Sequence, residues 1–141
     1  MQGEIAINTH GPGLTEITDK VAQWLPPGRD GLLSALVRHT SASLLIQENA
    51  DPDVQRDLMG YLERIAPRAN HPDMSWLRHV MEGPDDMPAH LKAALLPVSV
   101  QIPVRAGRMR LGTWQGLYLV EHRDRPHRRQ IALHFSADAA T

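Results

Sequence analysis

The sequence predicts an α+β fold, with mostly antiparallel sheet and about three helices. Segments with strand patterning outnumber those with helical patterning, and several of them follow one another directly, as in antiparallel hairpins. Apolar residues make up 42% and charged residues 22% of the chain, which is typical of a globular protein. The length of 141 residues suits one core but not two. We therefore expect a compact single domain over residues 1–141.

The first half of the chain mixes strand and helix patterns. Residues 4–8 alternate in polarity and predict a first strand. A helix with Thr15 as its N-cap is predicted next, because apolar residues recur at i, i+4, i+7 and i+8 (Ile17, Val21, Trp24 and Leu25). Residues 32–39 are apolar on both parities, which indicates a strand buried on both faces. Residues 44–47 repeat the strand pattern.

Two further helices are predicted in the middle of the chain. Asp51-Pro52-Asp53 is a strong helix start, with Asp as N-cap, Pro at the first helical position and a second Asp favoured by the helix dipole. The helix that follows carries an apolar stripe expected to face the core (Val54, Leu58, Tyr61, Leu62 and Ile65). Residues 68–76 are expected to be irregular. A third helix, from about residue 87 to residue 96, is expected to bury Leu91 and Leu95.

The last third of the chain is predicted to be strands. Residues 98–104 alternate strictly and predict a half-buried strand. Residues 117–123 and 130–135 predict two more strands, joined by the polar linker 124–127. The small, polar tail 136–141 is expected to fray.

Charge and composition exclude several classes of function. The formal net charge is −1, whereas phosphate-backbone binding needs a basic excess, so no nucleic-acid partner is expected. The chain has no cysteine, which excludes disulfides and thiolate chemistry. No apolar run approaches the roughly 20 residues of a membrane span, and the N-terminus lacks a signal pattern. We expect a cytoplasmic protein with no membrane partner.

The densest polar segment is residues 79–90. It holds two histidines and three carboxylates and is broken by glycine and proline, so it is predicted to be a loop that opens a helix. Imidazole and carboxylate are the ligand types of zinc and other divalent ions. Glu82 or Asp86 is also a candidate general base if burial raises its pKa. The alternative is a solvated loop with a helix cap, since the spacing of His79, Glu82 and His90 matches no compact metal motif.

Two other segments have dense polar groups. His39 ends a predicted strand and is followed by Thr40 and Ser41, hydroxyl residues with no evident structural task, whereas Asp51 is expected only to cap a helix. Residues 112–116 enclose Thr-Trp-Gln between glycines, and this tryptophan either stacks on a ligand or packs in the core.

Some polar residues are expected to have no special role. The charged run 121–125 is interpreted as a solvated strand end. Four histidines are interpreted as incidental (His10, His71, His127 and His134). The sequence has no Walker A, G-x-G-x-x-G or G-x-S-x-G pattern, so nucleotide-triphosphate, dinucleotide and serine-hydrolase functions lack support.

Taken together, these segments resemble the signature of the YjbQ family of small bacterial and archaeal proteins. The matching segments are His39–Leu44, Glu48–Val54, Arg78-His79, Glu82–His90 and Leu111–Gly116. The resemblance implies a compact α+β domain that assembles as a homotrimer. It also implies a low, secondary thiamin-phosphate-synthase activity, in which an aminopyrimidine diphosphate loses pyrophosphate and its carbon is captured by the thiazole phosphate nitrogen. The clustered histidines of the family look like a metal or anion site near subunit boundaries.

The resemblance assigns expected roles to individual residues. The expected catalytic residues are His39, His79, Glu82 and His90. The expected metal ligands, for a divalent ion such as Mg²⁺ or Zn²⁺, are His39, His79, His90 and Asp86. The expected contacts to a small phosphorylated substrate are Thr40, Ser41, Glu48, Asn49, Arg78 and Gln115, with Lys92 as a further cation for the leaving diphosphate.

Two alternatives use the same residues. One is a metal- or anion-binding protein in which the synthase activity is incidental. The other is a metal-assisted phosphate-ester hydrolase, with water as the nucleophile.

Overall fold

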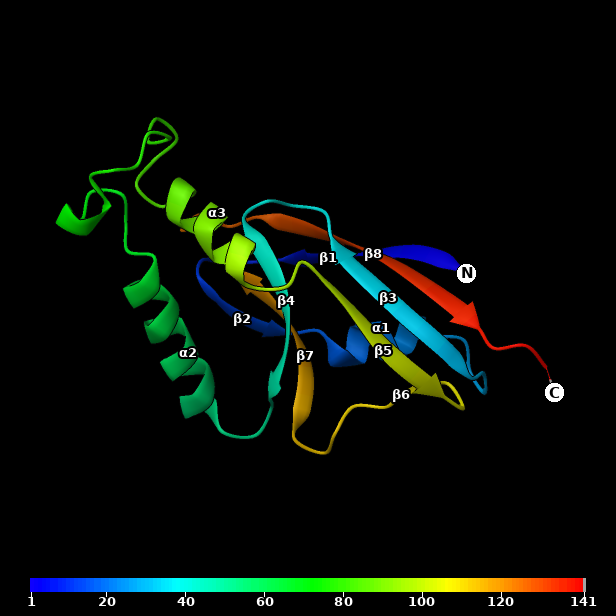
Figure 1. Cartoon of the computed structure of the whole chain (residues 1–141). Coiled ribbons are helices and arrows are strands. Elements are labelled where there is room, and N and C mark those ends of the chain that lie inside the picture. Colours follow the sequence, from blue (N-terminus) through cyan, green and yellow to red (C-terminus); the bar gives the residue numbers. More distant parts are fainter. Residues whose placement is uncertain (141) are drawn as a thin grey trace.

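The computed structural model describes residues 1–140, and its strands form two sheets (Figure 1). The strands are β1 (Gln2–Asn8), β2 (Gly13–Glu16), β3 (Gly31–Val37), β4 (Ala42–Glu48), β5 (Ser99–Arg105), β6 (Arg108–Met109), β7 (Gln115–Glu121) and β8 (Arg128–Ala137). The helices are α1 (Thr18–Trp24), α2 (Pro52–Ile65), the short 3₁₀ helix η1 (Pro72–Met74) and α3 (Asp86–Leu95).

Strand order separates the two sheets. The larger has the order β1-β8-β3-β5-β6, and the smaller has the order β2-β7-β4. Each described pairing is antiparallel, and β4 pairs with β7 from Ala42 opposite Glu121 to Glu48 opposite Gln115. The predicted α+β domain with mostly antiparallel sheet is therefore confirmed.

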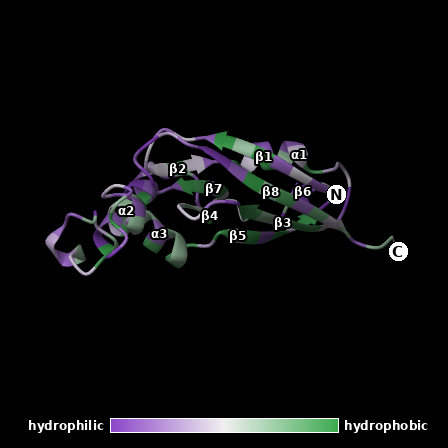
Figure 2. Ribbon diagram, turned by 90° about the horizontal axis from the view of Figure 1, so that it is seen from above, coloured by the Kyte–Doolittle hydropathy of each residue, from purple (hydrophilic) through white to green (hydrophobic). Residues whose placement is uncertain are grey.

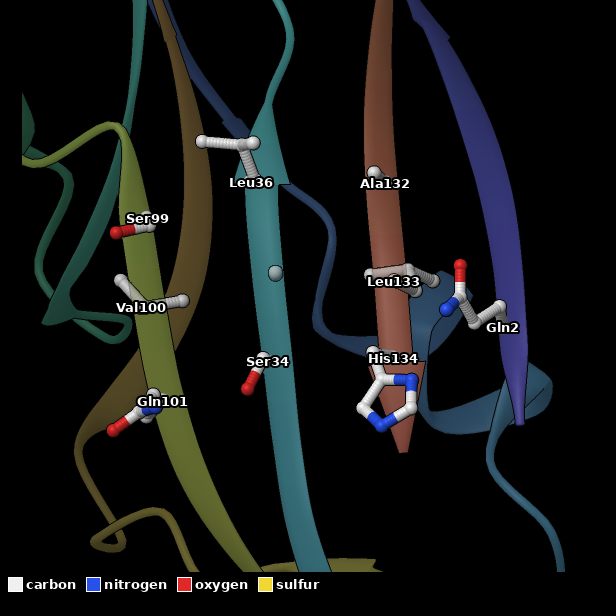
Figure 3. Close-up of a pocket in the computed structure, with 10 residues that line it drawn as sticks. Gln2, Ser34, Leu36, Ser99, Val100, Gln101, Ala132, Leu133 and His134 are labelled. Atoms are coloured by element: carbon white, nitrogen blue, oxygen red, sulfur yellow. The ribbon is translucent and has the colours of Figure 1, made fainter. Parts of the chain in front are cut away.

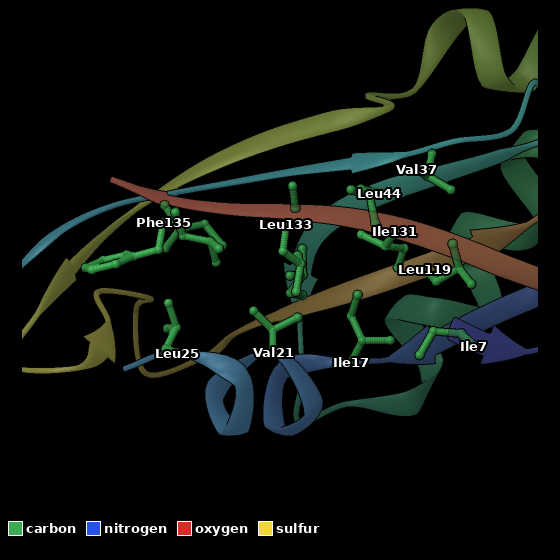
Figure 4. Packing of buried hydrophobic residues seen from close by; sticks show 14 of the residues in the cluster. Ile7, Ile17, Val21, Leu25, Val37, Leu44, Leu119, Ile131, Leu133 and Phe135 are labelled. Atoms are coloured by element: carbon green, nitrogen blue, oxygen red, sulfur yellow. The ribbon is translucent and has the colours of Figure 1, made fainter. Parts of the chain in front are cut away.

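The core lies between the larger sheet and a layer made of α1 and the smaller sheet (Figure 4). Val21 and Leu25 of α1 point toward Leu133 and Phe135 of β8, and Leu119 of β7 lies in the same layer. These side chains are aliphatic apart from one phenylalanine, in keeping with an aromatic content of 4%. Burial of this apolar surface is the main force that holds the two sheets together.

A buried ion pair also joins the sheets. Arg129 of β8 donates from Nε to Oε1 of Glu121 on β7 over 2.8 Å, and the two residues are 3% and 1% exposed. Thr9 donates to the same carboxylate oxygen over 2.6 Å, and Arg129 also donates to Ser41 Oγ over 2.9 Å. Because these contacts pair and hydrogen-bond both buried charges, they offset the free-energy cost of removing the charges from water.

Helices α2 and α3 lie at one end of the molecule, and both chain termini lie toward the other (Figures 1 and 2). Helix α2 begins as predicted, because the Asp51 side chain accepts a hydrogen bond from the Asp53 backbone N–H over 2.9 Å. In the described residues no helix has the length and apolarity needed to cross a membrane.

The start of the first helix differs from the prediction. Thr15 is not an N-cap but part of β2, where it pairs with Leu119 of β7, and α1 begins only after Ile17. Its local capping signal is overridden because pairing with β7 satisfies the backbone of this segment.

The prediction that β3 is buried on both faces is also wrong. Leu33, Ala35 and Val37 face the core, whereas Leu36 is 45% exposed on the opposite face of the larger sheet. That outer face forms a shallow groove of about 660 Å³ across β5, β3, β8 and β1, where Leu36 and Ala132 alternate with polar residues such as Ser34 and His134 (Figure 3). Leu36, on the second parity of β3, thus lines this open face.

Two further burial predictions and the prediction for the tail are wrong in part. In α3 the buried side is formed by Ala89, Lys92 and Ala93, while Leu95 is 67% exposed. In α2, Leu62 is buried as predicted, but Tyr61 and Ile65 are exposed. The tail does not fray from residue 136, because β8 continues to Ala137, which pairs with Gly31; Thr141 lies outside the described residues.

Candidate functional site

Three potential metal ligands converge at the start of α3. His79, Asp86 and His90 each offer one ligand atom, and these atoms all lie within 4.8 Å of one another. The Asp86 Oδ2 atom is 2.7 Å from His79 Nε2 and 3.3 Å from His90 Nε2. The Asp86 carboxylate is buried, whereas His79 is about half exposed and His90 one third exposed, so the group opens to solvent.

Local backbone structure explains this convergence. Gly83 has φ of +107°, a conformation that favours glycine, and it turns the loop so that α3 can begin at Asp86. Asp86 and His90 are four residues apart on the helix and therefore share a face. His79 comes from the preceding loop, and its ring lies edge-on to that of His90, with centroids 5.6 Å apart.

The hydrogen bond of His90 fixes its orientation. Its Nδ1 is 3.1 Å from the backbone carbonyl oxygen of Thr40, which can only accept, so Nδ1 carries the proton. The other nitrogen, Nε2, faces Asp86 at 3.3 Å from its Oδ2 atom and is the one left to bind an ion. An imidazole held through its second nitrogen by a backbone carbonyl is the usual arrangement of a metal ligand.

Arg123, just beyond β7, braces the acidic side of the site. Its Nη1 donates to Asp86 Oδ1 over 2.7 Å and its Nε donates to Asp85 Oδ2 over 2.8 Å. Its Nη2 donates to the Glu82 backbone carbonyl oxygen over 3.3 Å. Arg123 was not predicted from the sequence. The interpretation of the run 121–125 as solvated is wrong for its first three residues, because Glu121 and His122 are buried and Arg123 is largely so, whereas the last two residues are exposed.

These contacts keep both aspartates ionised. Burial alone would raise the pKa of Asp86, but the hydrogen bond with His79 and the charges of His90 and Arg123 outweigh it and hold this pKa below its usual value. For Asp85, burial is likewise outweighed by hydrogen bonds from Arg123 and the Asp124 backbone, so its pKa is also lowered. The Asp86 carboxylate therefore does not fit the role of general base with a raised pKa.

The donor set fits a zinc-type ion better than magnesium. Two imidazole nitrogens and a carboxylate oxygen are common zinc ligands, whereas magnesium prefers oxygen ligands only. In a tetrahedral site with bonds of about 2.0–2.1 Å, ligand atoms are roughly 3.3–3.4 Å apart. The distance of 3.3 Å between His90 Nε2 and Asp86 Oδ2 matches this spacing. The distance of 2.7 Å between His79 Nε2 and Asp86 Oδ2 is shorter, so the His79 ring would move slightly away from Asp86 when an ion binds.

His39 is not one of the three converging residues. Its Nε2 accepts a hydrogen bond from the Gln130 backbone N–H over 2.9 Å, which ties that nitrogen to β8. Burial and the nearby charge of Arg129 lower the pKa of His39 and favour its neutral form. These contacts describe a histidine that fixes the turn after β3.

The other residues expected at the site divide into near and distant groups. Thr40 is near the group, because its backbone carbonyl oxygen contacts His90 Nδ1. The Ser41 hydroxyl oxygen instead accepts a hydrogen bond from Arg129. Arg78 is exposed beside His79, and Glu82 Oε2 is 3.7 Å from His79 Nε2. Lys92 faces away from this group, with its Nζ 3.1 Å from Glu63 Oε2.

Glu48, Asn49 and Gln115 lie at the far end of the smaller sheet. Glu48 pairs with Gln115, six residues along β7 from Glu121, which corresponds to roughly 20 Å of strand. Glu48 Oε2 accepts from the backbone N–H groups of Ala50 and Asp51, and Gln115 Oε1 accepts from the Gly112 N–H. Trp114 is 65% exposed at this end, so it does not pack in the core.

A family model described as "UPF0047 protein YjbQ-like" matches residues 3–138 of the chain. The chain belongs to the YjbQ family. A YjbQ-family protein of Synechocystis sp., named a UPF0047 protein, is 45% identical over 136 residues, which cover 95% of this chain and 90% of that one. The UPF0047 protein YjbQ of Salmonella typhimurium is 49% identical over 108 residues, covering 77% and 74% of the two chains.

Solved structures share the fold of this YjbQ-family chain. A conserved hypothetical protein of Thermus thermophilus superimposes with a TM-score of 0.84 at 37% sequence identity and covers 95% of this chain and 99% of its own. A hypothetical protein of Aeropyrum pernix gives a TM-score of 0.85 at 28% identity, with 98% and 99% covered. The resemblance found in the sequence is thereby confirmed at the level of family and fold.

Proposed function

We propose that this YjbQ-family protein binds a divalent metal ion, zinc in preference to magnesium, through His79, Asp86 and His90. We propose further that it uses this site for a low thiamin-phosphate-synthase activity on small phosphorylated substrates. The observation that carries the proposal is the convergence of His79 Nε2, Asp86 Oδ2 and His90 Nε2 within 4.8 Å of one another, at a position open to solvent.

The reaction requires stabilisation of a leaving diphosphate. The bond between the pyrimidine methylene carbon and the diphosphate oxygen breaks, and a bond from that carbon to the thiazole nitrogen forms. His79, Asp86 and His90 would hold the divalent ion, which would supply positive charge for the departing pyrophosphate. Arg78, exposed beside His79, adds a second cation at the rim, while Arg123 keeps Asp86 ionised and oriented.

Zinc binding and synthase activity are measured separately to test the proposal. Zinc affinity is obtained by competition with a chromogenic chelator, and thiamin phosphate formation is followed from both purified substrates. His79→Ala and His90→Ala are each expected to lose zinc affinity by at least an order of magnitude and to reduce the rate to background. The control His10→Ala changes an exposed histidine outside the group and is expected to behave as wild type. Wild-type zinc affinity in both site variants would refute the metal site.

Metal-assisted phosphate-ester hydrolysis is the second candidate, because Glu82 lies beside the ligands. Its carboxylate is exposed and its Oε2 is 3.7 Å from His79 Nε2. It would therefore be close enough to accept a proton from a water molecule held at the proposed metal site. A phosphatase screen in zinc distinguishes the two functions. Turnover that is lost in Glu82→Gln, with zinc affinity retained, favours the hydrolase. If neither activity exceeds background, metal or anion binding is the function.

We also propose that the protein is a homotrimer. Two observations support assembly: the open outer face of the larger sheet, with Leu36 45% exposed, and the roughly 20 Å of β7 that separate Gln115 from Glu121, the end of the strand from which Arg123 reaches the histidine group. A neighbouring chain that covers the open face offers a way for Glu48, Asn49 and Gln115 to approach a substrate at the histidines. Light scattering coupled to size exclusion measures the mass, and a monomer at micromolar concentration would contradict the proposal.

A further inference from the structure

A small, partly open cavity lies behind the candidate site, between α2, α3 and the end of β7. Its volume is about 20 Å³, and a cavity needs roughly 10–15 Å³ to hold one water molecule. Apart from two prolines the lining residues are polar or charged, which is the other condition for hydration. It consists of Pro12, Glu63, Arg68, Asp85, Pro88, Lys92, His122 and Asp124.

His122 provides the observation that calls for a ligand. The residue is only 3% exposed, and its Nε2 lies 2.8 Å from the hydroxyl oxygen of Ser43, which is fully buried. The other ring nitrogen, Nδ1, is buried and has no hydrogen-bond partner among the described residues. Buried polar atoms in proteins are nearly always satisfied by protein or by ordered water.

The protonation state of His122 follows from its surroundings. Burial and the nearby charge of Lys92 lower the pKa of His122 to about 4, so the ring is neutral at physiological pH. A neutral imidazole has one N–H and one acceptor nitrogen. If Ser43 donates its hydroxyl proton to Nε2, the ring proton is on Nδ1, the atom that needs an acceptor.

We propose that this cavity binds a single water molecule, which accepts a hydrogen bond from His122 Nδ1 and another from Lys92 Nζ. The water donates its own protons to carboxylate oxygens of the lining, which Glu63, Asp85 and Asp124 supply. Lys92 has donors to spare, because its ammonium carries three protons and one is directed to Glu63 over 3.1 Å. Such a water has four partners and links β7, α2 and α3 behind Asp85, which in turn holds Arg123.

Nuclear magnetic resonance of the whole protein tests the proposal in solution. Nitrogen shifts of the His122 ring report its tautomer, and a rotating-frame cross-peak between the ring N–H and the water signal reports a bound water. We expect the Nδ1–H tautomer with such a cross-peak. The Nε2–H tautomer without a water cross-peak would overturn the proposal.

Two matched variants separate the ring nitrogens. The amide of His122→Asn reaches approximately the position of Nδ1, and the amide of His122→Gln reaches approximately that of Nε2. A crystal structure of each variant and of wild type is expected to show a solvent oxygen within hydrogen-bond distance of the residue-122 side chain in wild type and His122→Asn, and no such contact in His122→Gln. The reverse pattern, an empty cavity in wild type, or an anomalous signal from a halide would each refute the proposal. Should either variant fail to fold, the wild-type crystal and resonance data still decide.

Discussion

Arg123 is the residue on which the geometry of the candidate site depends most. Its guanidinium contacts Asp85, Asp86 and the Glu82 carbonyl at once, so a single side chain orients the loop and the first turn of α3. A planar guanidinium can make these contacts in fixed directions, which an ammonium cannot. Arg123 therefore acts on a bound ion through Asp86 and is a positioning residue.

We predict that Arg123→Gln weakens zinc binding by about 10–100-fold, the usual effect of removing a group that orients a ligand. Asp86 would lose its partner on Oδ1 and would rotate more freely, although all three ligands remain present. Zinc affinity measured by chelator competition, together with circular dichroism to confirm folding, checks this. The control is Arg125→Gln, an exposed arginine two residues further along. Equal affinities for the two variants would contradict the positioning role.

The sequence predicted part of this site for a physical reason. His79, Asp86 and His90 fall within one short segment, and helical spacing alone brings Asp86 and His90 to one face. Arg123 lies 37 residues beyond Asp86, and only the register of β7 and its exit from the sheet bring it there. Most of its neighbours in sequence are charged, and this pattern led to the prediction that the segment is an exposed strand end. The capture of His39 Nε2 by the Gln130 N–H also depends on pairing between distant strands.

Among the elements, α2 is expected to depend on its cap more than on burial. Only Leu62 of this helix is buried, so little tertiary packing holds it. The Asp51 side chain accepts the Asp53 N–H over 2.9 Å and satisfies one of the free donors at the helix start.

We predict that Asp51→Ala lowers the free energy of unfolding by about 1 kcal/mol, as expected for loss of an N-cap. Asp57→Ala removes an exposed carboxylate from the middle of the same helix and serves as the control, with a change near zero. Urea unfolding followed by circular dichroism gives both values. An Asp51→Ala protein as stable as the control would mean that the Asp51 side chain is not needed as a cap. If its zinc affinity or synthase rate also fell, Asp51 would have a functional role that the structure does not suggest.

The elements that the sequence predicted well are those with strong local signals. Helix α2 starts at an Asp-Pro-Asp sequence, and β5 alternates strictly, so both were found within a few residues. The β2 strand was missed because its four residues carry a helix-cap signal, and its strand character comes only from pairing with β7. The open face of β3 could not be inferred, since apolar residues on both parities do not distinguish a core from an uncovered surface.

For the whole molecule, burial of His122 makes stability depend on pH. Its pKa falls from 6.5 in the unfolded chain to about 4 in the folded protein. Folding thus favours the neutral ring, whereas the unfolded chain is protonated more readily. The free energy of unfolding therefore keeps its full value above pH 6.5 and loses the part due to His122 as the pH falls from 6.5 to about 4. At 1.36 kcal/mol per pKa unit, the loss is about 3 kcal/mol. Lowered pKa values at Asp85, Asp86 and Glu121 act at lower pH, as these carboxylates become protonated.

We predict that wild-type protein in chelator-treated buffer loses about 3 kcal/mol of unfolding free energy between pH 7 and pH 4 through this residue. Guanidinium unfolding at several pH values measures the slope. His122→Gln cannot titrate in this range, so its slope is expected to be smaller, with the burial of His39 accounting for part of what remains. Identical slopes for the two proteins would show that His122 is not the source.

The buried pair of Glu121 and Arg129 also constrains how this fold can diverge. Each charge is satisfied mainly by the other, and loss of one partner of a buried pair costs about 3–5 kcal/mol, a large part of the stability of a small domain. Replacement of both by apolar residues is tolerated far better. Any lineage that leaves this arrangement must therefore pass through a poorly folded single mutant or change both positions together. We expect these two positions to vary as a unit among descendants of a common ancestor.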